Sequence, residues 1–270
     1  MGLVSRNVII VSVCVFLFIL VVYLTREKVS QDTGYFSITY GTLSEQKKYS
    51  KYVNSAAGYW SDILTTSHPI SVSVRVYNNA NSSTIASASI SSTNSNRLAT
   101  RGVVNINSAI FDGLTSSTKY NAIKHEIGHI LGVGYWTRTA GTGSGARIVG
   151  TSYPTSLSEF NSLTGSSFTV GVPIESSGGS GTIGAHWEND YRSNFAETGH
   201  PSKGLKNELM AGYIGSTAFV SGVTLGYLKD IGWNVDISKK DPDEKFTFDL
   251  EVKTGLEVRH SGGCGICNHN

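Results

Sequence analysis

The sequence is poor in charge and almost free of cysteine. Asp, Glu, Lys and Arg make up 16% of the residues and the formal net charge is +2, so no strong electrostatic field points to a nucleic-acid partner. No cysteine lies between residues 25 and 263, which excludes a fold held together by disulfides. Aromatic residues reach 10%, and this content together with the low charge argues against a disordered chain. Cys264 and Cys267 form a single CxxC pair near the C-terminus, and a lone pair of this kind is too weak a signal to be assigned a role.

The N-terminal region contains an uninterrupted apolar run. Residues 8–24 carry no charge, and at about 1.5 Å per helical residue they reach roughly 25 Å, the short end of the range for a membrane span. A cleaved signal peptide has a shorter apolar core followed by a small-residue site, and VVYLTREK follows here instead. We therefore predict that residues 1–28 are a signal anchor, with residues 8–24 as a transmembrane helix and the following domain outside the cytoplasm. Secretion after signal cleavage is the alternative.

Hydrophobic periodicity divides the rest of the chain into helices and strands. We interpret residues 29–42 as a stalk, after which Thr42 and Glu45 form a capping box that opens an amphipathic helix. The predicted helices span residues 43–65, 116–132, 155–163 and 221–233, and the predicted strands span residues 69–77, 84–91 and 101–107. Residues 237–270 are predicted to form a C-terminal tail with a hairpin around Thr254.

The predicted helix over 116–132 carries an HExxH motif. His125 and His129 are one helical turn apart, so both imidazoles project from the same face and can bind one metal ion. Glu126 follows the first histidine, where a carboxylate is placed to act on a metal-bound water as a general base. A solvent-facing His-Glu-His triplet is the bland alternative, and the regular apolar stripe on the same helix argues against it.

A catalytic zinc site needs a third protein ligand. Gly132 fits the longer pattern HExxHxxGxxH, but Tyr135 stands where that pattern has its last histidine. His186 and His200 are the histidines that remain as candidates in the body of the chain, and Glu159 is a further alternative from a different class of HExxH protein. Spacing alone does not choose among them.

Four segments that occur in order resemble the leishmanolysin-like metzincins over roughly residues 43–236. These segments are HEIGHILGVGYW, VPIESSGGSGTIGAHWEND, NELMAGYIG and VTLGYLKDIGWNV. The resemblance implies that His186, followed by Trp187, is the third zinc ligand, and that Met210 belongs to the Met-turn below the metal. Tyr213 is a loose candidate for contacting the transition state, and core packing is its simpler role. The absence of a cysteine in the catalytic region argues against control by a propeptide cysteine.

The resemblance also implies the fold and the function. The expected fold is α+β, with a twisted sheet and an active-site helix in a catalytic domain over residues 43–236, behind the N-terminal transmembrane helix. The expected function is that of a membrane-anchored zinc metalloendopeptidase, in which Zn²⁺ activates water, Glu126 is the general base, and an extended protein or peptide substrate pairs with an edge strand at Val103–Asn107. A catalytically inactive zinc-binding adhesion or scaffold module is the alternative, as is hydrolysis of a non-peptide bond. The intact Glu126 argues against an inactive module, because binding alone needs no base.

Overall fold

The computed structural model describes residues 29–66, 68–179, 181–190, 192–195 and 200–249. The predicted membrane segment at 8–24, the hairpin around Thr254 and the CxxC pair lie outside these residues. Within them, no helix combines the length and the apolar character that crossing a membrane requires.

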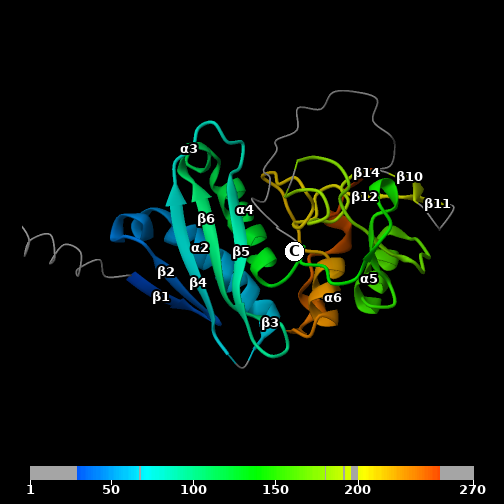
Figure 1. Cartoon of the computed structure of the whole chain (residues 1–270), viewed down its shortest axis with the longest axis horizontal. Coiled ribbons are helices and arrows are strands. Elements are labelled where there is room, and N and C mark those ends of the chain that lie inside the picture. Colours follow the sequence, from blue (N-terminus) through cyan, green and yellow to red (C-terminus); the bar gives the residue numbers. More distant parts are fainter. Residues whose placement is uncertain (1–28, 67, 180, 191, 196–199, 250–270) are drawn as a thin grey trace, which may run out of the picture.

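One half of the molecule, the sheet half, is built on a twisted five-stranded sheet (Figure 1). The spatial order of the strands is β1-β2-β4-β6-β5. β4 runs parallel to both β2 and β6, whereas β1 and β5 are antiparallel to their neighbours. The strands are β1 (Val29–Thr33), β2 (Phe36–Tyr40), β4 (Ile70–Tyr77), β5 (Ala86–Thr93) and β6 (Ala99–Asn107). The three strands predicted from alternation are thus confirmed, and the α+β class with them.

The prediction of a stalk over residues 29–42 is wrong. Residues 29–40 form the hairpin β1-β2, and β2 is paired along its whole length with β4. Phe36, Ile38 and Tyr40 alternate on the buried face and are at most 1% exposed. These three side chains belong to the core, because period-two burial is what a half-covered strand requires.

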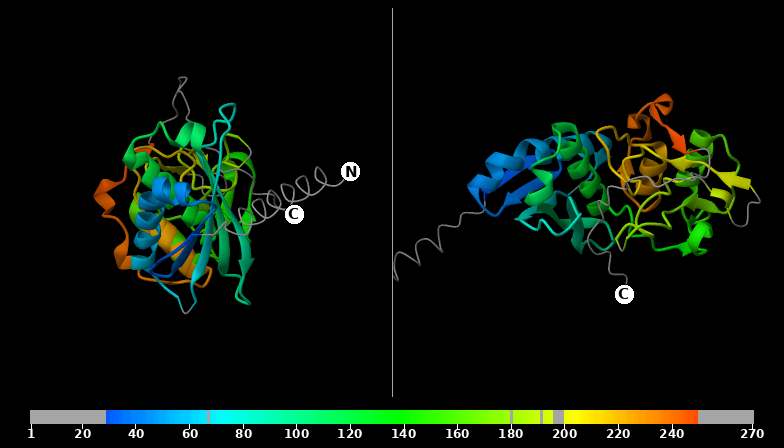
Figure 2. Two further views of the ribbon diagram at one scale, coloured as in Figure 1. Left: turned by 90° about the vertical axis from the view of Figure 1, so that its left-hand side faces the viewer. Right: turned by 90° about the horizontal axis from the view of Figure 1, so that it is seen from above.

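Two helices cover one face of the sheet (Figures 1 and 2). Helix α2 (Leu43–Ile63) begins at Thr42, whose Oγ1 accepts a hydrogen bond from the Glu45 amide at 3.1 Å, as the capping box predicts. Helix α4 (Ser116–Ile130) begins in the same way at Thr115 and packs against α2. A short helix, α3 (Ser108–Phe111), connects β6 to this layer.

The other half, the irregular half, packs against the end of α4 and has little regular structure (Figures 1 and 2). Its helices α5 (Pro154–Thr164) and α6 (Gly222–Asp230) lie side by side and confirm the two remaining helix predictions. The rest consists of short pieces: β3 (Leu64–Thr65), β7 (Thr139–Ala140), β8 (Arg147–Val149), β9 (Gly171–Pro173), β10 (Arg192–Phe195), β11 (His200–Ser202), β12 (Gly204–Leu205), β13 (Asn234–Val235), β14 (Phe248–Asp249), η1 (Gly143–Gly145), η2 (Ile237–Lys239) and η3 (Asp243–Lys245).

Two further expectations need correction. The strand β6, which contains Val103–Asn107, lies inside the sheet between β4 and β5, so the edge strand on this side is β5. The first part of the predicted tail is folded, because β14 pairs with β12 and Phe246 is only 7% exposed. Residues 237–249 therefore belong to the packed domain.

Candidate metal centre

Helix α4 brings the HExxH motif into the interior between the two halves. His125, Glu126 and His129 are 3%, 4% and 0% exposed, so the motif does not face solvent. Gly128, on the same turn, lets another segment approach closely: a Cβ added there would lie 2.5 Å from the Met210 sulfur. The helix and the segment around Met210 are therefore in direct contact.

The third histidine comes from the irregular half. His186 is fully buried, and the carbonyl of His186 and the amide of Trp187 both form backbone hydrogen bonds. The His186 carbonyl accepts from the Glu175 amide at 2.8 Å, and the Trp187 amide donates to the Met210 carbonyl at 3.0 Å. His186 is thus fixed between the segment around Glu175 and the segment around Met210.

His125, His129 and His186 converge on one point. Their Nε2 atoms are separated by 2.9 Å between His125 and His129, and by 3.1 Å from each of these to His186. They are one of two groups of metal-ligating side chains that converge among the described residues.

Each of these rings is oriented by a backbone carbonyl at its other nitrogen. The Nδ1 atoms lie 2.6 Å from the Leu209 carbonyl, 2.8 Å from the Val133 carbonyl and 3.0 Å from the Thr182 carbonyl, for His125, His129 and His186 respectively. A carbonyl only accepts hydrogen bonds, so each Nδ1 carries the proton and each Nε2 is left with its lone pair. The three lone pairs therefore face one another.

A divalent metal ion fits this donor set. Burial, followed by the neighbouring His129, lowers the pKa of His186 to about 3, and burial together with both neighbours lowers the pKa of His125 well below its ordinary value. The rings of His125 and His186 are hence neutral at physiological pH, and the neutral imidazole is the form that binds metal. Tetrahedral nitrogen ligands at about 2.0–2.1 Å from an ion lie roughly 3.3 Å apart, close to the observed separations of 2.9–3.1 Å.

The floor of the site is a buried hydrogen-bond network centred on Glu208. Its carboxylate accepts hydrogen bonds from the Met210 amide, from the Ser221 hydroxyl at 2.9 Å and from the Thr224 hydroxyl at 2.6 Å. Thr224 also accepts from the Trp187 indole at 2.8 Å. Burial raises the pKa of Glu208, and the four donors that it accepts from oppose this rise. Sequence patterns alone do not single out Glu208 and Thr224, although Glu208 lies within the NELM segment.

The network links the two segments that carry the histidines, helix α4 and the segment around His186. Glu208 positions the chain at Leu209, whose carbonyl orients His125. Trp187, the neighbour of His186, is tied through Thr224 to the same carboxylate. Glu208 thus connects the carbonyl that orients His125 with the residue that follows His186.

Glu126 lies close to the rim of the sheet. Tyr77, the last residue of β4, is 37% exposed, and its pKa is raised by burial and by the charge of Glu126. The charge of Glu126, next to the first histidine, thus acts on the end of β4.

The other candidate residues belong to other segments of the chain. Glu159 forms an ion pair with Lys240 at 3.2 Å and is not part of the histidine group. His200 is in β11, which pairs with β10. The Tyr213 hydroxyl lies near Gly178 and Thr182, in the loop before His186.

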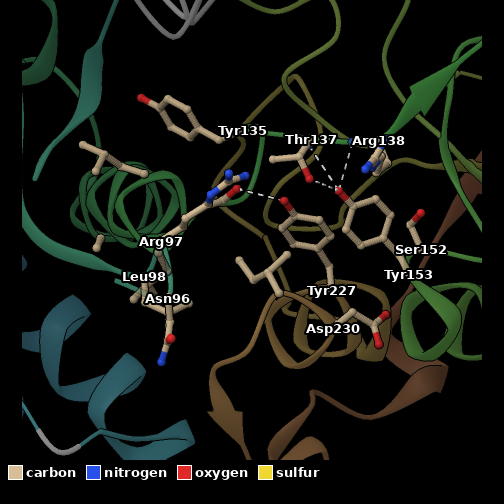
Figure 3. A pocket seen from close by; sticks show the side chains of 15 residues that line it. Asn96, Arg97, Leu98, Tyr135, Thr137, Arg138, Ser152, Tyr153, Tyr227 and Asp230 are labelled. Carbon is tan, nitrogen blue, oxygen red and sulfur yellow. Dashed lines mark hydrogen bonds between the residues drawn. The ribbon is translucent and has the colours of Figure 1, made fainter. Parts of the chain in front are cut away.

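A cavity of about 310 Å³ lies beside the end of α4, and none of the three histidines lines it (Figure 3). Tyr135, which replaces the histidine of the longer motif, lines this cavity. The Tyr227 hydroxyl donates to the Gly132 carbonyl at 3.3 Å. The Tyr153 hydroxyl accepts from the Thr137 and Arg138 amides, and Figure 3 shows these residues beside one another. Tyr153 and Tyr227 thus stabilise the turn that follows the HExxH helix through hydrogen bonds to its backbone.

Part of the chain is similar in sequence to a known protein. An alignment over 144 residues, which covers 49% of this chain, shows 28% identity to a leishmanolysin homolog from Crithidia fasciculata. The matched region spans 19% of that relative's length. No protein-family model matches the chain. The likeness agrees with the resemblance of the sequence motifs at the level of a distant relationship.

Proposed function

We propose that the protein is a zinc metalloendopeptidase related to the leishmanolysin-like metzincins. The observation that carries the proposal is the convergence of three buried imidazoles, two from an HExxH helix and one from a His-Trp segment, beside a methionine that packs against that helix. The similarity to a leishmanolysin homolog supports the same class.

His125, His129 and His186 would hold the zinc ion through Nε2. When bound there, zinc supplies Lewis acidity, which polarises a carbonyl group and makes a water molecule more acidic. Glu126 is next to the first of these histidines and is buried. In the proposed mechanism its carboxylate takes the proton from the attacking water and returns it to the nitrogen of the leaving amine.

The substrate is proposed to be an extended protein or peptide segment. The edge strand β5 lies on the side of the sheet that faces the irregular half (Figure 1). An extended peptide can add to an exposed edge of this kind through main-chain hydrogen bonds. Because α4 packs against both β5 and β6, a peptide along β5 would run beside the helix that carries Glu126.

We also propose that residues 8–24 anchor the chain in a membrane, with residues 30–270 outside the cytoplasm. The support is the uncharged apolar run without a cleavage site after it. Protease treatment of intact cells, followed with antibodies to each end, would remove the C-terminal epitope if this orientation is right. A mature N-terminus near residue 25 would show cleavage and release instead.

The experiment that tests the peptidase function is cleavage of a mixed peptide library by the purified protein. Cleavage should stop when zinc is removed with a chelator and return when zinc is added back. An inactive zinc-binding module would bind the metal but cleave nothing, and that result would favour the adhesion or scaffold alternative.

A further inference from the structure

A second group of ligating side chains lies beside the segment that carries His186. Glu175, Glu188 and Asp190 bring one carboxylate oxygen each within 4.8 Å of the others. Glu175 is fully buried and Glu188 is 2% exposed.

The two oxygens of the Glu175 carboxylate have different surroundings. Oε1 accepts hydrogen bonds from the Ser176 amide at 3.0 Å, and from the Ser177 amide and hydroxyl, each at 2.8 Å. Oε2 is buried and accepts no hydrogen bond from the residues that the structure describes. A buried carboxylate oxygen of this kind calls for a water molecule or an ion as its partner.

Hydrogen bonds connect the three acids of this group to one another. The Ser177 hydroxyl that binds Glu175 is also 3.4 Å from Asp190 Oδ2, so the two acids lie on either side of it. Glu188 Oε1 accepts from the Asp190 amide at 2.9 Å, which ties these two residues together. Asn189, between them, has a buried side-chain oxygen for which the described part of the chain offers no hydrogen-bond partner.

We propose that Glu175, Glu188 and Asp190 form a second metal site, separate from the three histidines, that binds Ca²⁺. The donors are all oxygen, which hard cations prefer and which zinc sites use less. Oxygens on opposite sides of a Ca²⁺ ion at about 2.3–2.6 Å are roughly 4.6–5.2 Å apart, which accommodates the observed limit of 4.8 Å. Mg²⁺, with shorter bonds and strict octahedral geometry, fits the loose cluster less well.

The Ca²⁺ site would stabilise the third histidine. The backbone of Glu175 binds the His186 carbonyl at 2.8 Å through its amide, and its own carbonyl accepts from the Gly184 amide at 2.7 Å. A Cβ added to Gly212, two residues after Met210, would lie 3.5 Å from the partnerless oxygen of Glu175. An ion here therefore fixes the loop before His186 and the segment around Met210 together.

The test measures Ca²⁺ binding and needs no peptide cleavage, so its outcome is independent of the proposed activity. The full-length chain, purified in detergent and saturated with zinc, is dialysed against Ca²⁺ and its bound metal and melting temperature are measured. We expect one Ca²⁺ per chain and, at a concentration about 100-fold above Kd, a rise in Tm on the order of 5–10 °C. Zinc loss to a zinc-selective chelator should become several-fold slower in Ca²⁺.

The decisive comparison is Glu175→Gln, which keeps the shape but removes a ligand charge, with Glu244→Gln as an exposed control. Glu175→Gln should weaken Ca²⁺ binding by about tenfold or more, and the control should bind like the wild type. If Glu175→Gln does not fold, Asp190→Asn at the half-buried edge of the cluster replaces it, with the same expectation. A wild type that binds no Ca²⁺, or ligand variants that bind it as the wild type does, would overturn the proposal. Unchanged zinc release in Ca²⁺ would overturn the coupling to His186.

Discussion

At the scale of single residues, the backbone carbonyls of Leu209, Val133 and Thr182 determine which nitrogen each histidine offers to a metal. Because they accept the Nδ1 protons, the three Nε2 atoms are the ligands without any rearrangement. Such contacts to the ligating side chains fix the ring orientation, and losing one typically lowers metal affinity by about tenfold to a hundredfold. The site is therefore preorganised by the main chain.

The third ligand can be tested by comparing His186→Ala with His200→Ala. Removing His186 leaves two histidines, too few for a stable catalytic site, so the variant should lose zinc and activity together. His200 lies in β11, and under the proposed assignment its removal should change neither. Zinc stoichiometry of the two purified proteins is the measurement. Loss of metal from His200→Ala with retention in His186→Ala would reverse the assignment.

The floor network can be tested with Thr224→Val, which keeps the shape of a fully buried side chain. The change removes a donor to Glu208 at 2.6 Å and the acceptor of the Trp187 indole at 2.8 Å. Leaving buried polar groups without partners costs about 1–3 kcal/mol, so the free energy of unfolding in urea should fall by that amount. Thr151→Val, at an exposed threonine, is the control and should be nearly neutral. An equal effect of both changes would show that the network contributes little.

The sequence predicts His125, Glu126 and His129 on its own, because one motif on one helix turn brings them together. His186 is selected over His200 only through the family resemblance, since two histidines in a Gly-rich region have no periodicity that separates them. Glu208, Thr224 and the cluster around Glu175 could not be predicted, because their partners are distant in sequence and several are backbone atoms.

At the scale of elements, α4 connects the two halves. Its apolar residues pack on α2 and the sheet, and its histidine face meets the irregular half. The long helices and the strands β4 and β6 could be predicted because their periodic patterns are long. The order of the strands could not, because β6 lies between β4 and β5, and this puts Val103–Asn107 inside the sheet.

The hairpin β1-β2 is an element that could not be predicted from the sequence pattern. Phe36, Ile38 and Tyr40 alternate as a strand should, but a five-residue stretch next to an apolar terminal run is a weak signal on its own. Only the pairing of β2 with β4 shows that these side chains belong to the core.

The contact between α4 and the segment around Met210 can be tested with Gly128→Ala. A Cβ there would lie 2.5 Å from the Met210 sulfur and 3.3 Å from the Trp60 ring, so the substitution should destabilise the protein by about 1–3 kcal/mol through overpacking. Alanine is the better helix former by roughly 1 kcal/mol, which makes a loss of stability diagnostic. Gly58→Ala in α2, whose Cβ would meet only Thr33 at 3.9 Å, is the control and should be neutral or stabilising.

A double-mutant cycle identifies the cause. Combining Gly128→Ala with Met210→Ala removes the close contact, so the two losses in unfolding free energy should be less than additive by about 0.5–3 kcal/mol. Additive losses would mean that the helix and the Met210 segment are not in the contact described above.

At the scale of the whole molecule, the metal site lies where the two halves meet, so metal binding and folding are linked. In zinc-free protein the pKa of His186 is lowered to about 3 and that of His125 is lowered as well, first by burial. The unfolded chain, with histidine pKa values near 6.5, binds more protons than the folded chain below that pH. The free energy of unfolding therefore rises with pH in this window.

The expected result is full stability of the zinc-free protein above about pH 6.5 and a progressive loss as the pH falls towards 3. The slope should reach at most about 1.4 kcal/mol per pH unit for each histidine. Urea unfolding of the zinc-free protein at several pH values measures it, and the zinc-free His186→Ala variant should show a shallower slope. A stability that does not change between pH 7 and 5 would contradict the burial of neutral imidazoles.

The most direct test of the proposed peptidase function is the zinc content and the peptide cleavage of Glu126→Gln, measured beside the wild type in the same preparation. Glu126 neighbours the first metal ligand but is not one of the three converging side chains. The variant should hold one zinc per chain, as the wild type does, and should cleave peptides about 10²–10⁴-fold more slowly, because general-base catalysis contributes on that order. Cleavage at the wild-type rate by zinc-loaded Glu126→Gln would contradict the proposed mechanism, and a wild type that holds zinc yet cleaves no peptide would contradict the proposed function.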